Sequence, residues 1–253
     1  MSGRVVVITG GASGLGAAMA DRLAGDGDTV IVADVDGDRA RDVAHAIAEQ
    51  GNTADHATVD VTKAGEVSGL FDAVTGAHGR LDGLVCSAAI ETRSGVVDCT
   101  DEEWQQVLDV NLKGPFLCMK YAIPKLVEGG GGSVVVLGST LAHIGSPGFA
   151  AYCASKGALV NLAKQAAIEH ASDGVRVNVV SPGACEVGLF MRVADEAPDP
   201  RALKDMVASR TPMGRLGRVD DVVATVEFLL GDGSAFISGA AIPLDGGLAA
   251  RRQ

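Results

Sequence analysis

The feature that most constrains the fold is a glycine-rich loop that follows a short apolar run near the start of the chain. Residues 4–9 are mostly β-branched and typical of a buried strand, and they lead into Thr9-Gly10-Gly11-Ala12-Ser13-Gly14-Leu15-Gly16. Residues 17–23 then have a helical pattern. Glycines let a backbone approach a pyrophosphate closely, and the N–H groups at a helix start meet its negative charge. Strand, loop and helix together predict a dinucleotide-binding unit.

A carboxylate follows the next apolar run. Residues 29–33 form a predicted buried strand that ends at Asp34, and a carboxylate about 20 residues past such a loop can accept hydrogen bonds from both ribose hydroxyls of adenosine. It would repel a 2′-phosphate, and neither Ser13 nor Val35 offers a cation to hold one. The sequence therefore predicts NAD(H) rather than NADP(H). The alternative is that Asp34 is a turn residue in the polar run 34–38.

The remaining chain alternates between apolar, β-branched runs and helical patterns. Strands are predicted at residues 53–59, 81–86, 133–137, 175–180 and 241–244, and helices at 39–49, 63–78, 101–111, 114–127, 151–170 and 219–230. This alternation predicts a parallel sheet covered on both faces, so we expect residues 1–253 to form a single doubly wound α/β domain, a Rossmann fold. Residues 184–218, interrupted by three prolines, are expected to be irregular and to form a substrate lid.

Composition narrows the classes of partner. With 21 Lys and Arg against 32 Asp and Glu, the formal net charge of -11 argues against a nucleic-acid partner. The five cysteines are odd in number and never spaced as Cys-x-x-Cys, which favours reduced thiols in the cytoplasm. The five histidines are scattered, so no catalytic metal is expected. No apolar run reaches the roughly 18 residues of a membrane span.

A candidate acid–base site lies in the predicted helix 151–170. Tyr152 and Lys156 are four residues apart and therefore share one face of that helix. A neighbouring ammonium would lower the phenol pKa from about 10, so that the tyrosine could move protons near neutrality. Ser139 follows the predicted strand 133–137, at the sheet edge where ligands bind. Taken alone, the Tyr-x-x-x-Lys pair is also typical of an ordinary surface turn.

These motifs occur in the order expected for the classical short-chain dehydrogenase/reductase family, and the chain resembles that family over essentially its whole length. TGGASGLG is similar to the family's TGxxxGxG loop, and DVNLKG to the segment that carries its catalytic asparagine. The resemblance implies a catalytic tetrad of Asn111, Ser139, Tyr152 and Lys156. In that tetrad Tyr152 is the general acid/base, Ser139 holds the substrate oxygen, Lys156 binds the nicotinamide ribose and Asn111 positions a water.

The resemblance also implies which residues bind the cofactor, including an adenine-contacting pair and a turn beside the nicotinamide. These residues are Gly10, Ser13, Gly14, Leu15, Gly16, Asp34, Asp60, Val61, Ser87, Ala88, Tyr152, Lys156, Pro182, Gly183, Cys185 and Val187. Two of these positions depart from the family pattern. Cys86-Ser87-Ala88-Ala89 replaces Asn-Asn-Ala-Gly, and Val187 replaces a threonine that would bond the carboxamide, so weaker cofactor affinity is expected.

The substrate side is less defined by the sequence. Glu91 and Glu186 either favour a cationic or polyhydroxylated substrate or are solvated surface acids, and His143 either touches substrate or is a loop residue. Phe149, Met191 and Cys185 either line an apolar pocket suited to a ring or medium-chain secondary alcohol, or belong to the core.

These observations predict an NAD(H)-dependent oxidoreductase that interconverts a secondary alcohol and a ketone. One alternative is a 3-oxoacyl thioester reductase, against which Asp34 and the acidic charge argue. Another is a dinucleotide-sensing regulatory protein, a class that tends to lose the tyrosine or the lysine. The resemblance further implies a homotetramer that assembles through the apolar segment 236–247, because an apolar edge strand needs covering.

Overall fold

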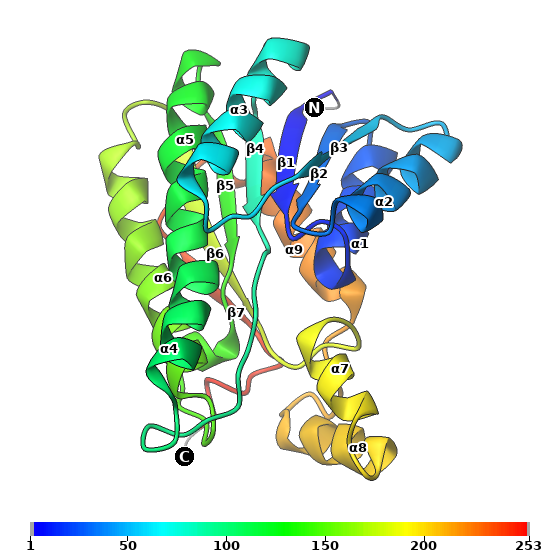
Figure 1. Cartoon of the computed structure of the whole chain (residues 1–253), viewed down its shortest axis with the longest axis vertical. Coiled ribbons are helices and arrows are strands. Elements are labelled where there is room, and N and C mark those ends of the chain that lie inside the picture. Colours follow the sequence, from blue (N-terminus) through cyan, green and yellow to red (C-terminus); the bar gives the residue numbers. More distant parts are fainter. Residues whose placement is uncertain (1–2, 252–253) are drawn as a thin grey trace.

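A parallel seven-stranded sheet forms the centre of the computed structural model, which describes residues 3–251 (Figure 1). The strand order is β3-β2-β1-β4-β5-β6-β7, and every neighbouring pair is parallel. The strands are β1 (Val5–Thr9), β2 (Thr29–Asp34), β3 (Ala54–Thr58), β4 (Gly83–Cys86), β5 (Gly132–Leu137), β6 (Val175–Pro182) and β7 (Ala241–Leu244). The predicted doubly wound Rossmann fold is confirmed.

The order of the strands reverses beside β1. Val7 of β1 pairs with Ile31 of β2 on one side and with Leu84 of β4 on the other, so the chain extends the sheet in both directions from this point. The crossover connections from β1 and β4 leave toward opposite faces, which opens a crevice at the carboxyl ends of these strands. Ligands of open α/β sheets bind in such a crevice.

Each face of the sheet is covered by its own apolar core. Val5 and Val7 face one core, and Val6 and Ile8 face the other, because side chains alternate along a strand. The first core is closed by α3 (Ala64–His78), α5 (Gly114–Glu128) and α6 (Ala150–Glu169). The second is closed by α1 (Gly14–Gly25), α2 (Gly37–Glu49) and α9 (Val219–Leu230), and Figure 1 shows the two groups on opposite sides.

The segment predicted to be irregular contains two helices. α7 (Leu189–Asp195) and α8 (Pro200–Arg210) form a separate pair beyond the carboxyl edge of the sheet (Figure 1). Pro200 does not break a helix but begins one, because a proline at the first helical position has no N–H to leave unbonded. The Asp199 side chain caps α8 by accepting the Ala202 N–H at 2.9 Å. The prediction of an irregular stretch was therefore wrong for these residues.

Two predicted helices are joined without a break. α4 (Asp101–Leu108) passes through a π-helical turn, Asp109–Lys113, directly into α5. The start of α4 is a capping box, in which Thr100 and Glu103 each accept the other's backbone N–H. π-turns are common at functional sites because they turn a side chain out of the helical register. Here the turn carries Asn111, one of the predicted catalytic residues.

Candidate active site

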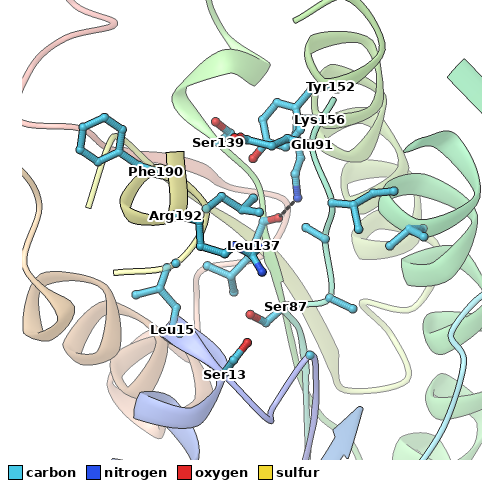
Figure 2. Close-up of a pocket in the computed structure, with 18 of the residues that line it drawn as sticks. Ser13, Leu15, Ser87, Glu91, Leu137, Ser139, Tyr152, Lys156, Phe190 and Arg192 are labelled. Atoms are coloured by element: carbon cyan, nitrogen blue, oxygen red, sulfur yellow. Dashed lines mark hydrogen bonds between the residues drawn. The ribbon is translucent and has the colours of Figure 1, made fainter. Parts of the chain in front are cut away.

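One cavity of about 1560 Å³ runs across the carboxyl edge of the sheet, and its lining includes Asp34, Tyr152 and residues of α7. Figure 2 shows Ser13, Leu15 and Ser87 near one part of it and Ser139, Tyr152, Lys156 and Glu91 near another, with Leu137 between. All of the predicted cofactor residues line it except Gly16. The arrangement therefore brings the glycine loop and the candidate acid–base residues to one continuous site.

The glycine loop fits tightly against the neighbouring strand end. Gly10 has a φ of +68°, and a Cβ there would lie 2.6 Å from the Ala88 backbone. A Cβ on Gly16 would lie 2.0 Å from the Gly10 carbonyl oxygen. Gly16 is therefore required for the close packing of the loop, although it does not line the cavity. Ser13 is the N-cap of α1, and its side chain makes no capping hydrogen bond. The loop and helix start thus form a narrow cradle of backbone, which suits a pyrophosphate.

Asp34 is held in place by one backbone N–H of the glycine loop and by one from the residue two positions after it. Its carboxylate accepts the N–H of Ala12 and the N–H of Asp36, each at 3.1 Å, and it lines the cavity. Arg39, in the first turn of α2, lines the same end and pairs with Asp36 at 3.4 Å. Sequence reasoning missed this cation because it considered only Ser13 and Val35. Arg39 could have been found from the sequence, because it lies in the first turn of the helix that follows Asp34.

The predicted adenine-contacting pair also lines this end. Asp60 accepts the backbone N–H and the hydroxyl of Thr62 at 2.9 and 2.7 Å. The backbone hydrogen bond from Thr62 is the main cause that lowers the pKa of the Asp60 carboxyl. The carboxylate is therefore a fixed acceptor beside Val61 on the cavity wall.

Tyr152 and Lys156 lie one turn apart on α6, as predicted, and both are buried. The Lys156 Nζ donates to the Leu137 carbonyl oxygen at 2.8 Å and lies 5.7 Å from the centroid of the Tyr152 ring. Ser139 caps a short 3-10 turn, Thr140–Ala142, and its hydroxyl accepts the Leu141 N–H at 3.1 Å. Three candidate catalytic side chains thus meet at the carboxyl end of β5.

The expected lowering of the tyrosine pKa does not hold in this structure. Burial raises the pKa of Tyr152 to about 12, and the Ser139 side chain opposes that rise without cancelling it. Burial also lowers the pKa of Lys156 to about 8. The reason is that the ammonium is directed to the Leu137 carbonyl, while the phenol lies in a desolvated position.

The lysine gives this site a measurable stability signature. Between about pH 8 and pH 10.4 the unfolded chain holds a proton that folded Lys156 has lost, so this residue makes the free energy of unfolding rise with pH, by up to about 3 kcal/mol. We expect Lys156→Met to remove that rise. The measurement is urea unfolding of wild type and variant at pH 7.5 and 10, with Lys164→Met on the same helix as control. Identical pH dependences for wild type and Lys156→Met would contradict it.

Asn111 is not among the residues that line the cavity, and its predicted water-positioning role stays a prediction. It is fully buried in the π-turn. Its amide oxygen accepts the Ile90 N–H at 2.9 Å, and its amide nitrogen donates to the Ile90 carbonyl at 2.8 Å. The same nitrogen lies 3.3 Å from the Ser155 hydroxyl. Asn111 is therefore a positioning residue that joins the segment after β4 to α6.

The two departures from the family pattern, at residues 86–89 and at Val187, both lie at the cavity, as the motifs predict. Ser87 and Ala88 line the cavity beside the glycine loop, and so do Pro182, Gly183, Cys185 and Val187 beyond β6. Gly183 is held against β7 by its N–H, which donates to the Leu244 carbonyl at 3.0 Å. Burial raises the pKa of the Cys185 thiol to about 11, so this cysteine is a neutral wall residue.

Four of the five candidate substrate residues line the cavity: Glu91, Phe149, Glu186 and Met191. His143 is not among the lining residues. Its Nε2 lies 3.0 Å from the Ser181 hydroxyl, which favours the interpretation of His143 as a loop residue. The Phe149 ring stacks edge-to-face on Tyr152 at 6.4 Å, which fixes one wall beside the phenol.

The structure adds lining residues that the sequence did not indicate. Arg93 lies over the Phe149 ring at 5.3 Å, and Arg192 comes from α7. Apolar residues of α7 and of neighbouring loops complete the wall: Leu141, Leu189, Phe190 and Leu248. Because α7 was not predicted, the sequence did not indicate which of its side chains face the cavity.

Two classes of feature are absent from residues 3–251. Within this range no group of three or more His, Cys, Asp or Glu side chains is placed to hold a metal ion. None of the helices there is both long enough and apolar enough to cross a membrane.

Fold and site together define a dinucleotide-binding α/β protein of the Rossmann type. Residues 10–249 match the family model described as enoyl-(acyl carrier protein) reductase. The chain belongs to the classical short-chain dehydrogenase/reductase family.

Named relatives agree with that assignment. The chain is 37% identical to cis-4-hydroxycyclohexanecarboxylate dehydrogenase of Sinomonas cyclohexanicum, over 98% of this chain and 97% of the relative. It is 36% identical to 2-(S)-hydroxypropyl-CoM dehydrogenase 3 of Xanthobacter autotrophicus, over 99% and 98%. A structure of gluconate 5-dehydrogenase from Burkholderia cenocepacia with NADP and tartrate superposes with a TM-score of 0.93 at 29% identity, over 100% and 97%. The chain is an oxidoreductase of this family.

Proposed function

We propose that the chain is an NAD(H)-dependent oxidoreductase that interconverts a secondary alcohol and a ketone. One observation carries the proposal: a single cavity joins the Asp34 carboxylate to the Tyr152 phenol. The residues present fit a nicotinamide dinucleotide, because the glycine cradle excludes any Cβ at Gly10 and Gly16 and because Asp34 is a fixed acceptor at the far end.

When bound, the nicotinamide supplies or accepts the hydride. The chain's own residues orient the substrate and move the proton. Ser139 would hold the substrate oxygen, and Tyr152 would give its proton to that oxygen during reduction or take it during oxidation. Lys156 would bind the nicotinamide ribose, and the same cation would offset the effect of burial on the Tyr152 pKa. The catalytic roles of these three residues are part of the proposal.

The choice of NAD(H) over NADP(H) rests on Asp34. A carboxylate fixed by two backbone N–H groups can accept ribose hydroxyls but would repel a 2′-phosphate. Arg39 acts in the opposite direction, because it lines the same end, but its partner Asp36 neutralises part of its charge. A similar protein has been solved with NADP, so membership of the family does not by itself select NAD(H).

A ring or medium-chain secondary alcohol suits the apolar wall best. Phe149, Phe190 and Met191 line the cavity near Tyr152 and the lid, and one relative is named for a hydroxylated cyclohexane ring. Residues 184–218 would act as the substrate lid, because α7 contributes several lining residues while α8 stands outside them.

A 3-oxoacyl thioester reductase is the second candidate. A relative from Thermotoga maritima that is 32% identical over 98% of this chain is named a 3-oxoacyl-[acyl-carrier-protein] reductase, which favours it. Asp34 and the net charge of -11 disfavour it, because an acidic surface repels an acidic carrier.

The test is oxidation of NADH and of NADPH by purified protein over cyclic ketones, diketones, amino ketones, sugars and one acetoacetyl thioester. We expect turnover with NADH on a cyclic ketone. Turnover of the thioester with NADPH alone would overturn both the cofactor and the substrate class. If the protein binds NADH but turns over none of these substrates, the result would favour a dinucleotide-sensing protein.

We also propose a homotetramer in the cytoplasm. Support comes from β7, an edge strand of the sheet, and from the exposed aromatic rings of Phe228 and Phe236 in the helix and loop before it. Exposed edges and large apolar side chains of this kind are typical of interfaces. Sedimentation should give a mass four times that of the 25.6 kDa chain. A monomer at micromolar concentration would contradict the assembly.

A further inference from the structure

Glu91 is one of two candidate substrate carboxylates that line the cavity, the other being Glu186, and it is the one whose charge acts on the Tyr152 phenol. Glu91 is half-buried. Figure 2 shows it beside Tyr152 and Ser139. Within residues 3–251 no hydrogen bond or ion pair to its side chain is present, whereas Asp34 and Asp60 at the other end both accept backbone N–H groups. A carboxylate is an acceptor, and when half-buried it needs a donor.

The backbone on both sides of Glu91 is fixed. Ile90, directly before it, exchanges two hydrogen bonds with the buried Asn111 side chain. Three residues later, Ser94 bridges to Phe149, and its carbonyl accepts the Ala150 N–H at 3.1 Å, at the start of α6. Since α6 also carries Tyr152, the position of Glu91 is set relative to the phenol. A fixed acceptor beside a reacting group is typical of a specificity determinant.

The charges around Glu91 restrict the kind of donor. Arg93 and Arg192 both lower the pKa of this carboxyl, against the larger effect of burial, which raises it. A substrate ammonium placed at Glu91 would meet these two guanidinium groups, and a substrate carboxylate would meet Glu91 itself. A neutral hydroxyl avoids both repulsions and still supplies the missing hydrogen bond.

We propose that Glu91 is a specificity residue that accepts a hydrogen bond from a second hydroxyl group of the substrate, so that the enzyme prefers diols to mono-alcohols. This inference rests on the proposed alcohol oxidation and names its substrate class more closely. The hydroxyl that reacts would lie at Ser139 and Tyr152, and the second one at Glu91.

The test compares cyclohexanol with the cis and trans isomers of cyclohexane-1,2-diol and cyclohexane-1,3-diol as substrates with NAD. We expect kcat/KM for at least one diol to exceed that for cyclohexanol by roughly tenfold or more, the range for a hydrogen bond to a charged acceptor. Glu91→Leu should reduce this ratio roughly 10- to 100-fold, chiefly by raising KM for the diol. Glu91→Gln should keep part of it, because the amide oxygen still accepts.

The control is Glu196→Leu, which removes a carboxylate at the end of α7 that does not line the cavity. The inference would be overturned if the wild type used diols and cyclohexanol with nearly equal kcat/KM, or if Glu91→Leu left the ratio of these two values unchanged. In either case turnover of cyclohexanol would still support the proposed function. A preference for 2-aminocyclohexanol that Glu91→Gln abolishes would also overturn the inference, because that result indicates a cationic substrate.

Binding gives a readout that does not depend on turnover. The binding of the same diols is measured by calorimetry in the presence of NAD, with the Tyr152→Phe variant and with the double variant Tyr152→Phe/Glu91→Leu. We expect the double variant to bind the diols more weakly. Equal diol affinity in the two proteins would overturn the inference even if no alcohol is oxidised, an outcome that would separately contradict the proposed function.

Discussion

Replacing Tyr152 with phenylalanine is expected to lower kcat about a thousandfold, the middle of the range for loss of a positioned acid or base. The phenol is buried and its pKa is raised to about 12, so without assistance it holds its proton at neutral pH. In the proposed mechanism the phenol acts as an acid during reduction, and Lys156 is the group that would assist the reverse step. Phenylalanine keeps the ring that stacks on Phe149. NADH affinity, measured by fluorescence titration, should therefore stay within about threefold of wild type.

The chain contains a matched control for this experiment. Its other tyrosine, Tyr121 on α5, also has a lysine near its ring, with the Lys120 Nζ at 5.4 Å, but does not line the cavity. Tyr121→Phe should leave kcat close to that of wild type. Retained turnover in Tyr152→Phe would remove this residue from the mechanism, and equal losses in both variants would indicate a structural cause.

Replacing Asp34 with serine should shift the cofactor preference toward NADPH by about a hundredfold or more, measured as the ratio of kcat/KM for NADH to that for NADPH. Two hydrogen bonds from the ribose hydroxyls to a charged acceptor would be lost, each of about 1.5–3 kcal/mol. The repulsion of a 2′-phosphate would be lost as well. Arg39, which lines the same end of the cavity, would then face that phosphate with less opposition.

Asp34 also accepts the Ala12 N–H, so the serine variant loosens the glycine loop and can weaken both cofactors. Asp34→Asn separates the two effects, because it keeps an acceptor for Ala12 and removes the charge. Adding Arg39→Gln to Asp34→Asn should reverse the gain in NADPH use. A wild-type enzyme that uses NADPH as well as NADH would show that Arg39, and not Asp34, dominates this end of the site.

Much of the fold was predictable because its signals are local. The buried run of β1 and the glycine loop are defined by neighbouring residues, and the structure changes only the bounds. β1 begins at Val5 instead of residue 4, and α1 spans Gly14–Gly25 instead of residues 17–23. The pairing of Tyr152 with Lys156 follows from helical spacing in the same way. These features depend on periodicity and on backbone geometry, both of which a sequence displays directly.

The errors concern features that depend on distant parts of the chain. α7 and α8 lie in a segment with three prolines, and Pro200 reads as a helix breaker unless its place at the first helical position is known. The pKa of Tyr152 depends on burial by the surrounding fold and on where the Lys156 ammonium is directed, and neither is visible in their spacing. Arg192 enters the cavity only because α7 forms.

Asn111 has a consequence for the exchange of loops between enzymes of this kind. One amide fixes the backbone at Ile90 and contacts Ser155, next to the lysine of the acid–base pair. The segment proposed to select substrate and the helix proposed to carry out the proton transfer are thus connected through the π-turn. A loop transplanted without that turn would lose its alignment, so the natural module for engineering new specificity runs from β4 through the π-turn.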